Sequence, residues 1–113
     1  MTAGSADLAD FYQRLLRSWS VETSGRWRHD NPASGQCGVT ALIVHDRMGG
    51  EILKTDVNGT WHFYNRVEGK RIDFTMGQFD SPIGYDDTPS SRDEAFGDCT
   101  PQQYQLLRSR VAD

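Results

Sequence analysis

The sequence has 113 residues, of which 36% are hydrophobic and 25% charged, and its formal net charge is −4. This length and composition predict a single soluble domain over residues 1–113, and the acidic balance argues against a protein that coats a nucleic-acid backbone. No apolar run matches a membrane-spanning helix and the N-terminus lacks a secretory pattern, so we expect a cytoplasmic protein that binds neither nucleic acid nor membrane.

The first expected element is an amphipathic N-terminal helix over Ser5–Trp19. Its apolar residues recur at helical spacing, namely Leu8, Phe11, Tyr12, Leu15 and Leu16. Residues 18–32 break this pattern and end in Asn31-Pro32, which favours an irregular connection.

A central helix is expected next, from about Cys37 to Arg47. Residues 35–46 are mostly apolar, and Gly49-Gly50 follows in the way that helix C-termini often end. Because the apolar side chains cover most of the circumference, this helix should be buried. A buried strand is the alternative interpretation of the same run.

Strand-like patterning follows over Glu51–Thr55, Trp61–Val67 and Lys70–Thr75. The first two runs are joined by residues 56–59, which contain Asn-Gly, and the last two by Glu68-Gly69. If Glu68-Gly69 is a two-residue turn, Tyr64 faces Asp73 across the hairpin and His62 faces Thr75. We therefore expect an α+β fold in which the central helix packs on an antiparallel sheet of three or more strands.

The chain from Met76 to Asp98 contains Pro82, Gly84 and Pro89 and is expected to be a long loop. Long loops in small domains often carry function, so we expect this one to form a wall of the site, with Gln78, Tyr85 and Arg92 as its polar contacts.

A C-terminal helix then begins at Thr100. Thr100 suits the N-cap, Pro101 the first turn and Gln103 the reciprocal position of a capping box. Tyr104, Leu107 and Val111 should face the core together.

Cys37 is the candidate nucleophile because it stands at the start of the central helix. Unpaired N–H groups and the helix dipole at such a position favour a thiolate. The alternative is that Cys37 is a small core residue, since free cysteine is often buried. Cys99 precedes the C-terminal helix and is expected to be a bystander, and both thiols should be free.

His62 and Asp73 are the candidate base and orienting acid. In the expected register they are diagonal neighbours on one face of the hairpin, close enough for their side chains to meet. Their alternatives are structural, with His62 a packed aromatic and Asp73 a partner of Arg66 or Arg71. Asn65 replaces Asp73 as the orienting residue only in a different register, because alternation directs it away from His62.

Further contacts are expected around this trio. Gln36 precedes the nucleophile and is a candidate oxyanion donor, as is the backbone N–H of Cys37. Tyr64, Asn65 and Gln78 complete the expected substrate-binding set. His29, His45 and His62 show no metal-ligand spacing with the cysteines, so we expect neither a metal nor another cofactor.

Several ordered blocks resemble the YunG-like family of small bacterial proteins, and the resemblance covers roughly Ser18 to Arg110. The blocks are Trp19-Ser20, Asn31-Pro32-Ala33, Gly35 to Leu42, Gly49 to Thr55, Trp61 to Asn65, Asp73-Phe74-Thr75, Gln78-Phe79, Arg92, Glu94-Ala95-Phe96 and Tyr104. That family implies no settled activity.

A more distant resemblance concerns the chain order Cys37, His62, Asp73, which is similar to that of transglutaminase-like and papain-like proteins. It implies a papain-like core, with Cys37 as nucleophile, His62 as base and Asp73 as orienter. The implied function is cysteine-dependent amide hydrolysis or acyl transfer on an unknown peptide, amide or acyl substrate. Two alternatives stay open, a non-catalytic binding or regulatory protein and an isomerase or biosynthetic enzyme, and the sequence also leaves a homodimer open.

Overall fold

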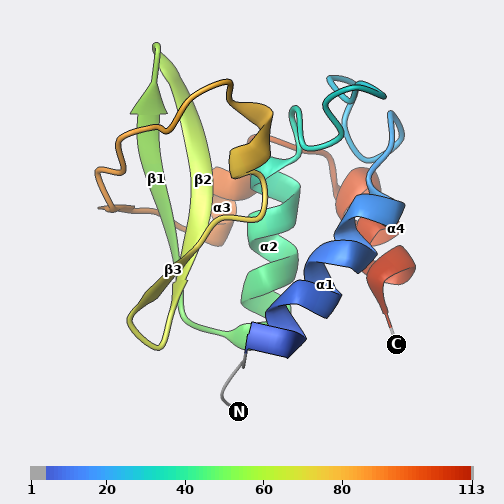
Figure 1. Ribbon diagram of the computed structural model, residues 1–113, viewed down its shortest axis with the longest axis horizontal. Coiled ribbons are helices and arrows are strands. Elements are labelled where there is room, and N and C mark those ends of the chain that lie inside the picture. The colour runs from blue at the N-terminus through green and yellow to red at the C-terminus, as the bar shows by residue number, and fades with distance from the viewer. Residues whose placement is uncertain (1–4, 113) are drawn as a thin grey trace.

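The computed structural model describes residues 5–112, in which helices pack on one face of an antiparallel sheet (Figure 1). The helices are α1 (Ser5–Ser18), α2 (Cys37–Met48), α3 (Arg92–Phe96) and α4 (Pro101–Val111). The strands are β1 (Glu51–Val57), β2 (Thr60–Val67), β3 (Lys70–Ile72) and β4 (Thr88–Pro89), in the sheet order β3-β2-β1-β4. The expected α+β class is therefore confirmed.

Two tight turns set the register of the sheet. Asn58-Gly59 joins β1 to β2 and Glu68-Gly69 joins β2 to β3, and all of these residues have positive φ. Such turns suit the twist of a hairpin. Arg66 pairs with Arg71, so the expected register is confirmed.

The third strand is shorter than its pattern predicts. It ends at Ile72, and Asp73 instead turns the chain, because its Oδ1 accepts hydrogen bonds from the backbone and hydroxyl of Thr75. Asp73 thus lies just beyond the ladder.

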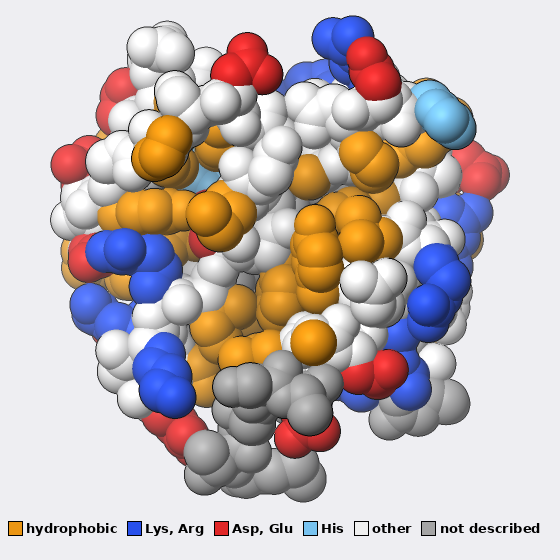
Figure 2. Space-filling model, in the orientation of Figure 1, with side chains coloured by type: hydrophobic (Ala, Val, Ile, Leu, Met, Phe, Trp, Pro, Cys, Tyr) orange, Lys and Arg blue, Asp and Glu red, His pale blue; other side chains and the backbone are white. Residues whose placement is uncertain are grey.

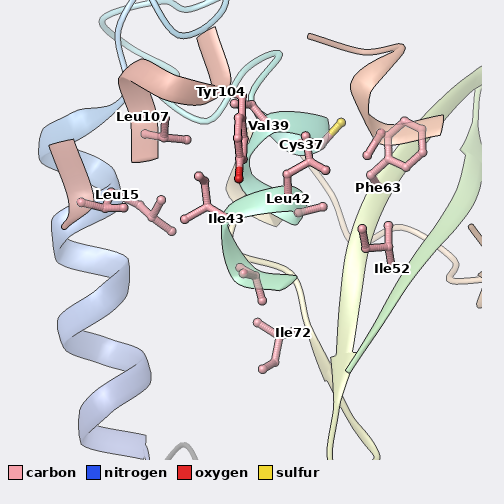
Figure 3. Packing of buried hydrophobic residues seen from close by; sticks show 14 of the residues in the cluster. Leu15, Cys37, Val39, Leu42, Ile43, Ile52, Phe63, Ile72, Tyr104 and Leu107 are labelled. Carbon is pink, nitrogen blue, oxygen red and sulfur yellow. The ribbon is translucent and has the colours of Figure 1, made fainter. Parts of the chain in front are cut away.

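Helix α2 is the centre of the molecule. It lies between the sheet and the pair α1 and α4 (Figure 1), and all of its residues from Cys37 to Val44 are buried. Side chains from α1, α2, α4 and the sheet meet in one hydrophobic cluster (Figure 3). The amide of Asn65 in β2 donates to the carbonyl of Ala41, which fixes the sheet against the helix.

The segment from Met76 to Asp98 is not the irregular loop expected from its composition. It contains a 3-10 turn (η1, Met76–Gln78), strand β4 and helix α3, whose N-cap Ser91 accepts from the backbone of Glu94. The α4 capping box between Thr100 and Gln103 is confirmed. No helix in the described part of the chain is long and apolar enough to cross a bilayer.

Candidate active site

The first turn of α2 positions Cys37, and its thiol points toward β2 (Figure 3). The preceding residue, Gln36, is fully buried. Its Oε1 accepts from the Thr23 hydroxyl at 2.8 Å and its Nε2 donates to the Ser20 carbonyl at 3.3 Å. Both ends of the amide that we expected at an oxyanion site are thus bonded to the 20–23 loop, where Gln36 anchors the start of the helix.

His62 and Asp73 meet at the end of the β2–β3 hairpin. The Nε2 of His62 lies 2.7 Å from Oδ2 of Asp73, and each side chain is only 3% exposed. Tyr85 donates its hydroxyl to the same carboxylate oxygen at 2.8 Å. The ring of Phe79 packs edge-on against His62. The structure therefore brings the expected base and acid together inside a shell of aromatic residues.

The partners of Asp73 determine which ring nitrogen of His62 carries hydrogen. The Tyr85 hydroxyl and both the backbone N–H and the hydroxyl of Thr75 donate to this carboxylate, and an ionised carboxylate can only accept. Nε2 of His62 accordingly donates to Asp73, and the other nitrogen of a neutral ring keeps its lone pair. Nδ1 is buried and has no hydrogen-bond partner among the described residues.

The thiol of Cys37 does not make the hydrogen bond to His62 that the sequence led us to expect. It donates instead to Oδ2 of Asp98 at 3.4 Å. Cys37 lies against β2, because the backbone of Phe63, the residue after His62, forms a hydrogen bond with the sulfur and lowers the thiol pKa. The expected nucleophile and base are thus not hydrogen-bonded to each other.

The expectation of a thiolate at this helix start is also corrected. Burial is the main reason that the pKa of Cys37 rises from 9.0 to about 12, and the negative charge of Asp98 raises it further. Arg26 lowers the pKa by a smaller amount. Burial likewise raises the pKa of Cys99, to about 11, and both cysteines are free. Cys37 therefore rests as a protonated thiol.

The other predicted contacts lie at different places around the hairpin. Tyr64 stacks on the His62 ring and its hydroxyl donates to Asp87 at 2.8 Å. Asn65 points to the opposite face, toward α2, as strand alternation requires. Gln78 bonds through its amide to the Thr75 carbonyl.

Arg92 does not contact this site. Its guanidinium pairs with Asp46 and approaches His45 and Tyr104, far along α2 from Cys37. Of the polar residues selected in the 76–98 segment, Tyr85 is the one that bonds to Asp73. Asp98, which bonds to Cys37, was not selected, because no pattern in the sequence links it to the start of α2.

An apolar groove borders the site. It has a volume of about 420 Å³ and runs between α1 and residues 73–77, and its lining includes Asp73 together with Leu8, Tyr12, Phe74 and Met76. Figure 2 shows hydrophobic side chains gathered in a hollow on this face. Asp73 thus lies between the groove and His62. Among the described residues, no cluster of three His, Cys, Asp or Glu side chains could hold a metal ion.

Comparisons with known proteins give one clear relationship. Residues 7–113 match the model of a family described as YunG protein. The chain is 52% identical over 94 residues to the "Uncharacterized protein YunG" of Bacillus subtilis (strain 168), covering 83% of this chain and 82% of that protein. No solved structure matches the chain, so the expected papain-like similarity has no support from a known structure.

Proposed function

The chain belongs to the YunG family, and from that premise we propose that it is a cysteine-dependent amide hydrolase or acyl transferase. In this proposal Cys37 is the nucleophile, His62 the general base and Asp73 the residue that orients His62. The observation that carries the proposal is the buried His62–Asp73 pair, whose remaining nitrogen, Nδ1, has no partner among the described residues.

The energetic argument concerns that nitrogen. A buried polar atom without a partner costs free energy, and such atoms are rare in folded proteins. Only two buried side-chain polar atoms in the described chain lack partners, Nδ1 of His62 and Nε1 of Trp27. A base that must receive a proton needs an unoccupied lone pair, so function accounts for the cost at His62.

The arrangement of elements adds support. A cysteine begins a central helix that packs on an antiparallel sheet. The histidine follows on that sheet and the acid just after its next strand, in the same chain order. This is the arrangement of papain-like and transglutaminase-like proteins, and a distant relationship to them is part of the proposal.

The reaction begins when the proton of the Cys37 thiol passes to Nδ1 of His62 and the sulfur adds to the carbonyl carbon of an amide or ester. The bond to the leaving amine or alcohol breaks, and that group takes the proton from His62, which leaves a thioester on Cys37. Water or a second amine then gives a proton to His62 and attacks the thioester. Cys37 leaves and recovers the proton as a thiol.

A second candidate is a non-catalytic binding protein that keeps the same core. The burial of Cys37, which is 6% exposed, and its bond to Asp98 favour this reading. In that case Cys37 and His62 are packing residues.

Acylation by p-nitrophenyl acetate separates the two candidates. In a Cys99→Ala background, we expect acetylation of Cys37, mapped by mass spectrometry, and its loss in Cys37→Ala. His62→Gln should slow it at least about tenfold, because general-base catalysis typically contributes 10²-fold or more. His29→Gln is the matched control, since His29 is exposed and should leave the rate unchanged.

The binding-protein reading replaces the proposal if Cys37 stays unmodified while other residues are acetylated. The base assignment is wrong if His62→Gln melts at the wild-type temperature and acetylates at the wild-type rate.

A further inference from the structure

We propose that the carboxylate of Asp98 occupies the position that the substrate's carbonyl oxygen takes during reaction, at the start of α2. There it keeps Cys37 protonated until substrate displaces it. The inference rests on the proposed function, because it assigns the regulation of the same nucleophile. Asp98 is a positioning residue in this account and Gly38 supplies the oxyanion donor.

The contacts of a single oxygen carry the argument. Oδ2 of Asp98 accepts from the backbone N–H of Gly38 at 3.0 Å and from the thiol of Cys37 at 3.4 Å. The oxygen therefore sits next to the sulfur and on a helix-terminal N–H. A carbonyl oxygen needs this position when its carbon is attacked by the sulfur, since an oxyanion is stabilised by donors at about 2.7–3.1 Å.

The chain around this oxygen is shaped to admit a carboxylate. A Cβ at Gly38 would lie 2.6 Å from both Cβ and Oδ2 of Asp98, and 3.0 Å from the carbonyl oxygen of Ala95. Real atoms do not approach so closely, so any side chain at position 38 would push Asp98 away. The glycine that follows the nucleophile is thus explained by the close approach of Asp98.

A second observation concerns the base that the proposed function assigns to this reaction. Nδ1 of His62 is buried without a partner, and the residue after His62, Phe63, forms a backbone hydrogen bond to Cys37. Once Asp98 leaves, a substrate carbonyl would find the sulfur and the Gly38 N–H together, and in the proposed reaction Nδ1 of His62 receives the thiol proton.

The position of Asp98 allows its side chain to move away from Cys37. It lies in the link between α3 and α4, and its side chain is 18% exposed. Its other oxygen, Oδ1, pairs with Arg26 at 3.1 Å, and that arginine is 56% exposed. An ion pair open to solvent contributes little, about 0–1 kcal/mol, so it does not lock the carboxylate in place.

The charges that face Cys37 fix the sign of the effect. Asp98 comes from the α3–α4 link and Arg26 from the loop after α1. Asp98 raises the pKa of the thiol, and Arg26 lowers it by less. Removing the charge of Asp98 should therefore release thiolate at lower pH.

The test is the pH profile of Cys37 alkylation by iodoacetamide in a Cys99→Ala background. Asp98→Asn keeps an oxygen that can accept from Gly38 but removes the negative charge. We expect the midpoint of the profile to fall by about one pH unit and the rate at pH 7 to rise at least about threefold, after allowing for the lower nucleophilicity of a less basic thiolate. Asp98→Ser should shift the midpoint in the same direction.

Asp80→Asn is the matched control, because it removes the same charge from an exposed residue and should leave the profile unchanged. The inference is overturned if Asp98→Asn and Asp98→Ser, both folded by their melting curves, keep the wild-type midpoint.

The outcomes for the two proposals are distinct. If Asp98→Asn shifts the midpoint of the alkylation profile and His62→Gln acetylates normally, the role of Asp98 stands and His62 is not the general base. If the midpoint is unchanged and His62→Gln acetylates slowly, His62 is the general base and the role of Asp98 is rejected.

Discussion

At Cys37 two effects oppose the influence of the helix terminus on the thiol pKa, and their sizes decide whether the thiol is protonated. The N-terminus of a helix favours a nearby negative charge by roughly 0.3–1 kcal/mol, which is less than one pKa unit. Burial and the charge of Asp98 instead raise the thiol pKa from 9.0 to about 12. The helix start alone therefore does not supply a thiolate, so the proposed reaction needs a base to remove the proton, and we assign that role to His62.

Alkaline pH should destabilise the folded protein through Cys37. The unfolded thiol loses its proton near its ordinary pKa of 9.0, whereas the folded thiol keeps it to about 12. Between these values the folded state binds more protons, so the free energy of unfolding falls as pH rises, by up to about 1.4 kcal/mol per pH unit for one group. Burial of Tyr64, whose pKa is raised to about 12, acts in the same direction above its ordinary value of 10.0.

Urea unfolding of Cys99→Ala and of Cys37→Ser/Cys99→Ala at pH 8 and pH 10 measures this effect. We expect the first protein to lose more stability between the two pH values. Equal losses would show that the folded Cys37 titrates like an exposed thiol.

Residue-level prediction succeeded where contacts follow local geometry. His62 and Asp73 were expected together because alternation and a two-residue turn determine which side chains share a face. Asp98 lies 61 residues from Cys37 in the chain, and Tyr85 reaches Asp73 from a segment without repeating pattern. Such contacts depend on how elements pack, which neither spacing nor turn type reveals.

At the scale of elements, helix-capping residues located the helices better than the composition of a segment did. Proline and glycine in the 76–98 segment suggested a loop, yet Ser91 and Glu94 have the spacing of a helix start, and α3 begins there. The clearer signal at Thr100, Pro101 and Gln103 located α4. Strand β3 ended early because the carboxylate of Asp73 bonds to Thr75 and turns the chain.

The α4 capping box gives a stability prediction. Thr100→Ala removes the acceptor for the backbone N–H of Gln103 and should lower the free energy of unfolding by about 1 kcal/mol. Thr100→Ser keeps an acceptor and should cost less. The exposed Gln102→Ala serves as control, and denaturant unfolding is the measurement. Equal stability of Thr100→Ala and wild type would mean that the cap contributes nothing.

For the whole molecule, the candidate residues come from segments that are far apart in the chain. Cys37 begins α2 and bonds to Asp98 from the α3–α4 link, while β2 and the end of β3 bring His62 and Asp73 together. The hydrophobic pattern was sufficient to predict an α+β molecule built around one buried helix. It did not predict β4 or α3, because elements of two and five residues are too short to show a period.

The central claim is that Nδ1 of His62 is an unprotonated base beside Cys37. The imidazole ¹⁵N spectrum of the Cys99→Ala protein at neutral pH, recorded before and after alkylation of Cys37 with iodoacetamide, tests it most directly. We predict that Nε2 of His62 carries the hydrogen and Nδ1 does not, and that the Nδ1 resonance moves on alkylation while that of the exposed His29 stays in place. A hydrogen on Nδ1, or an Nδ1 resonance that alkylation leaves unmoved, would contradict the account.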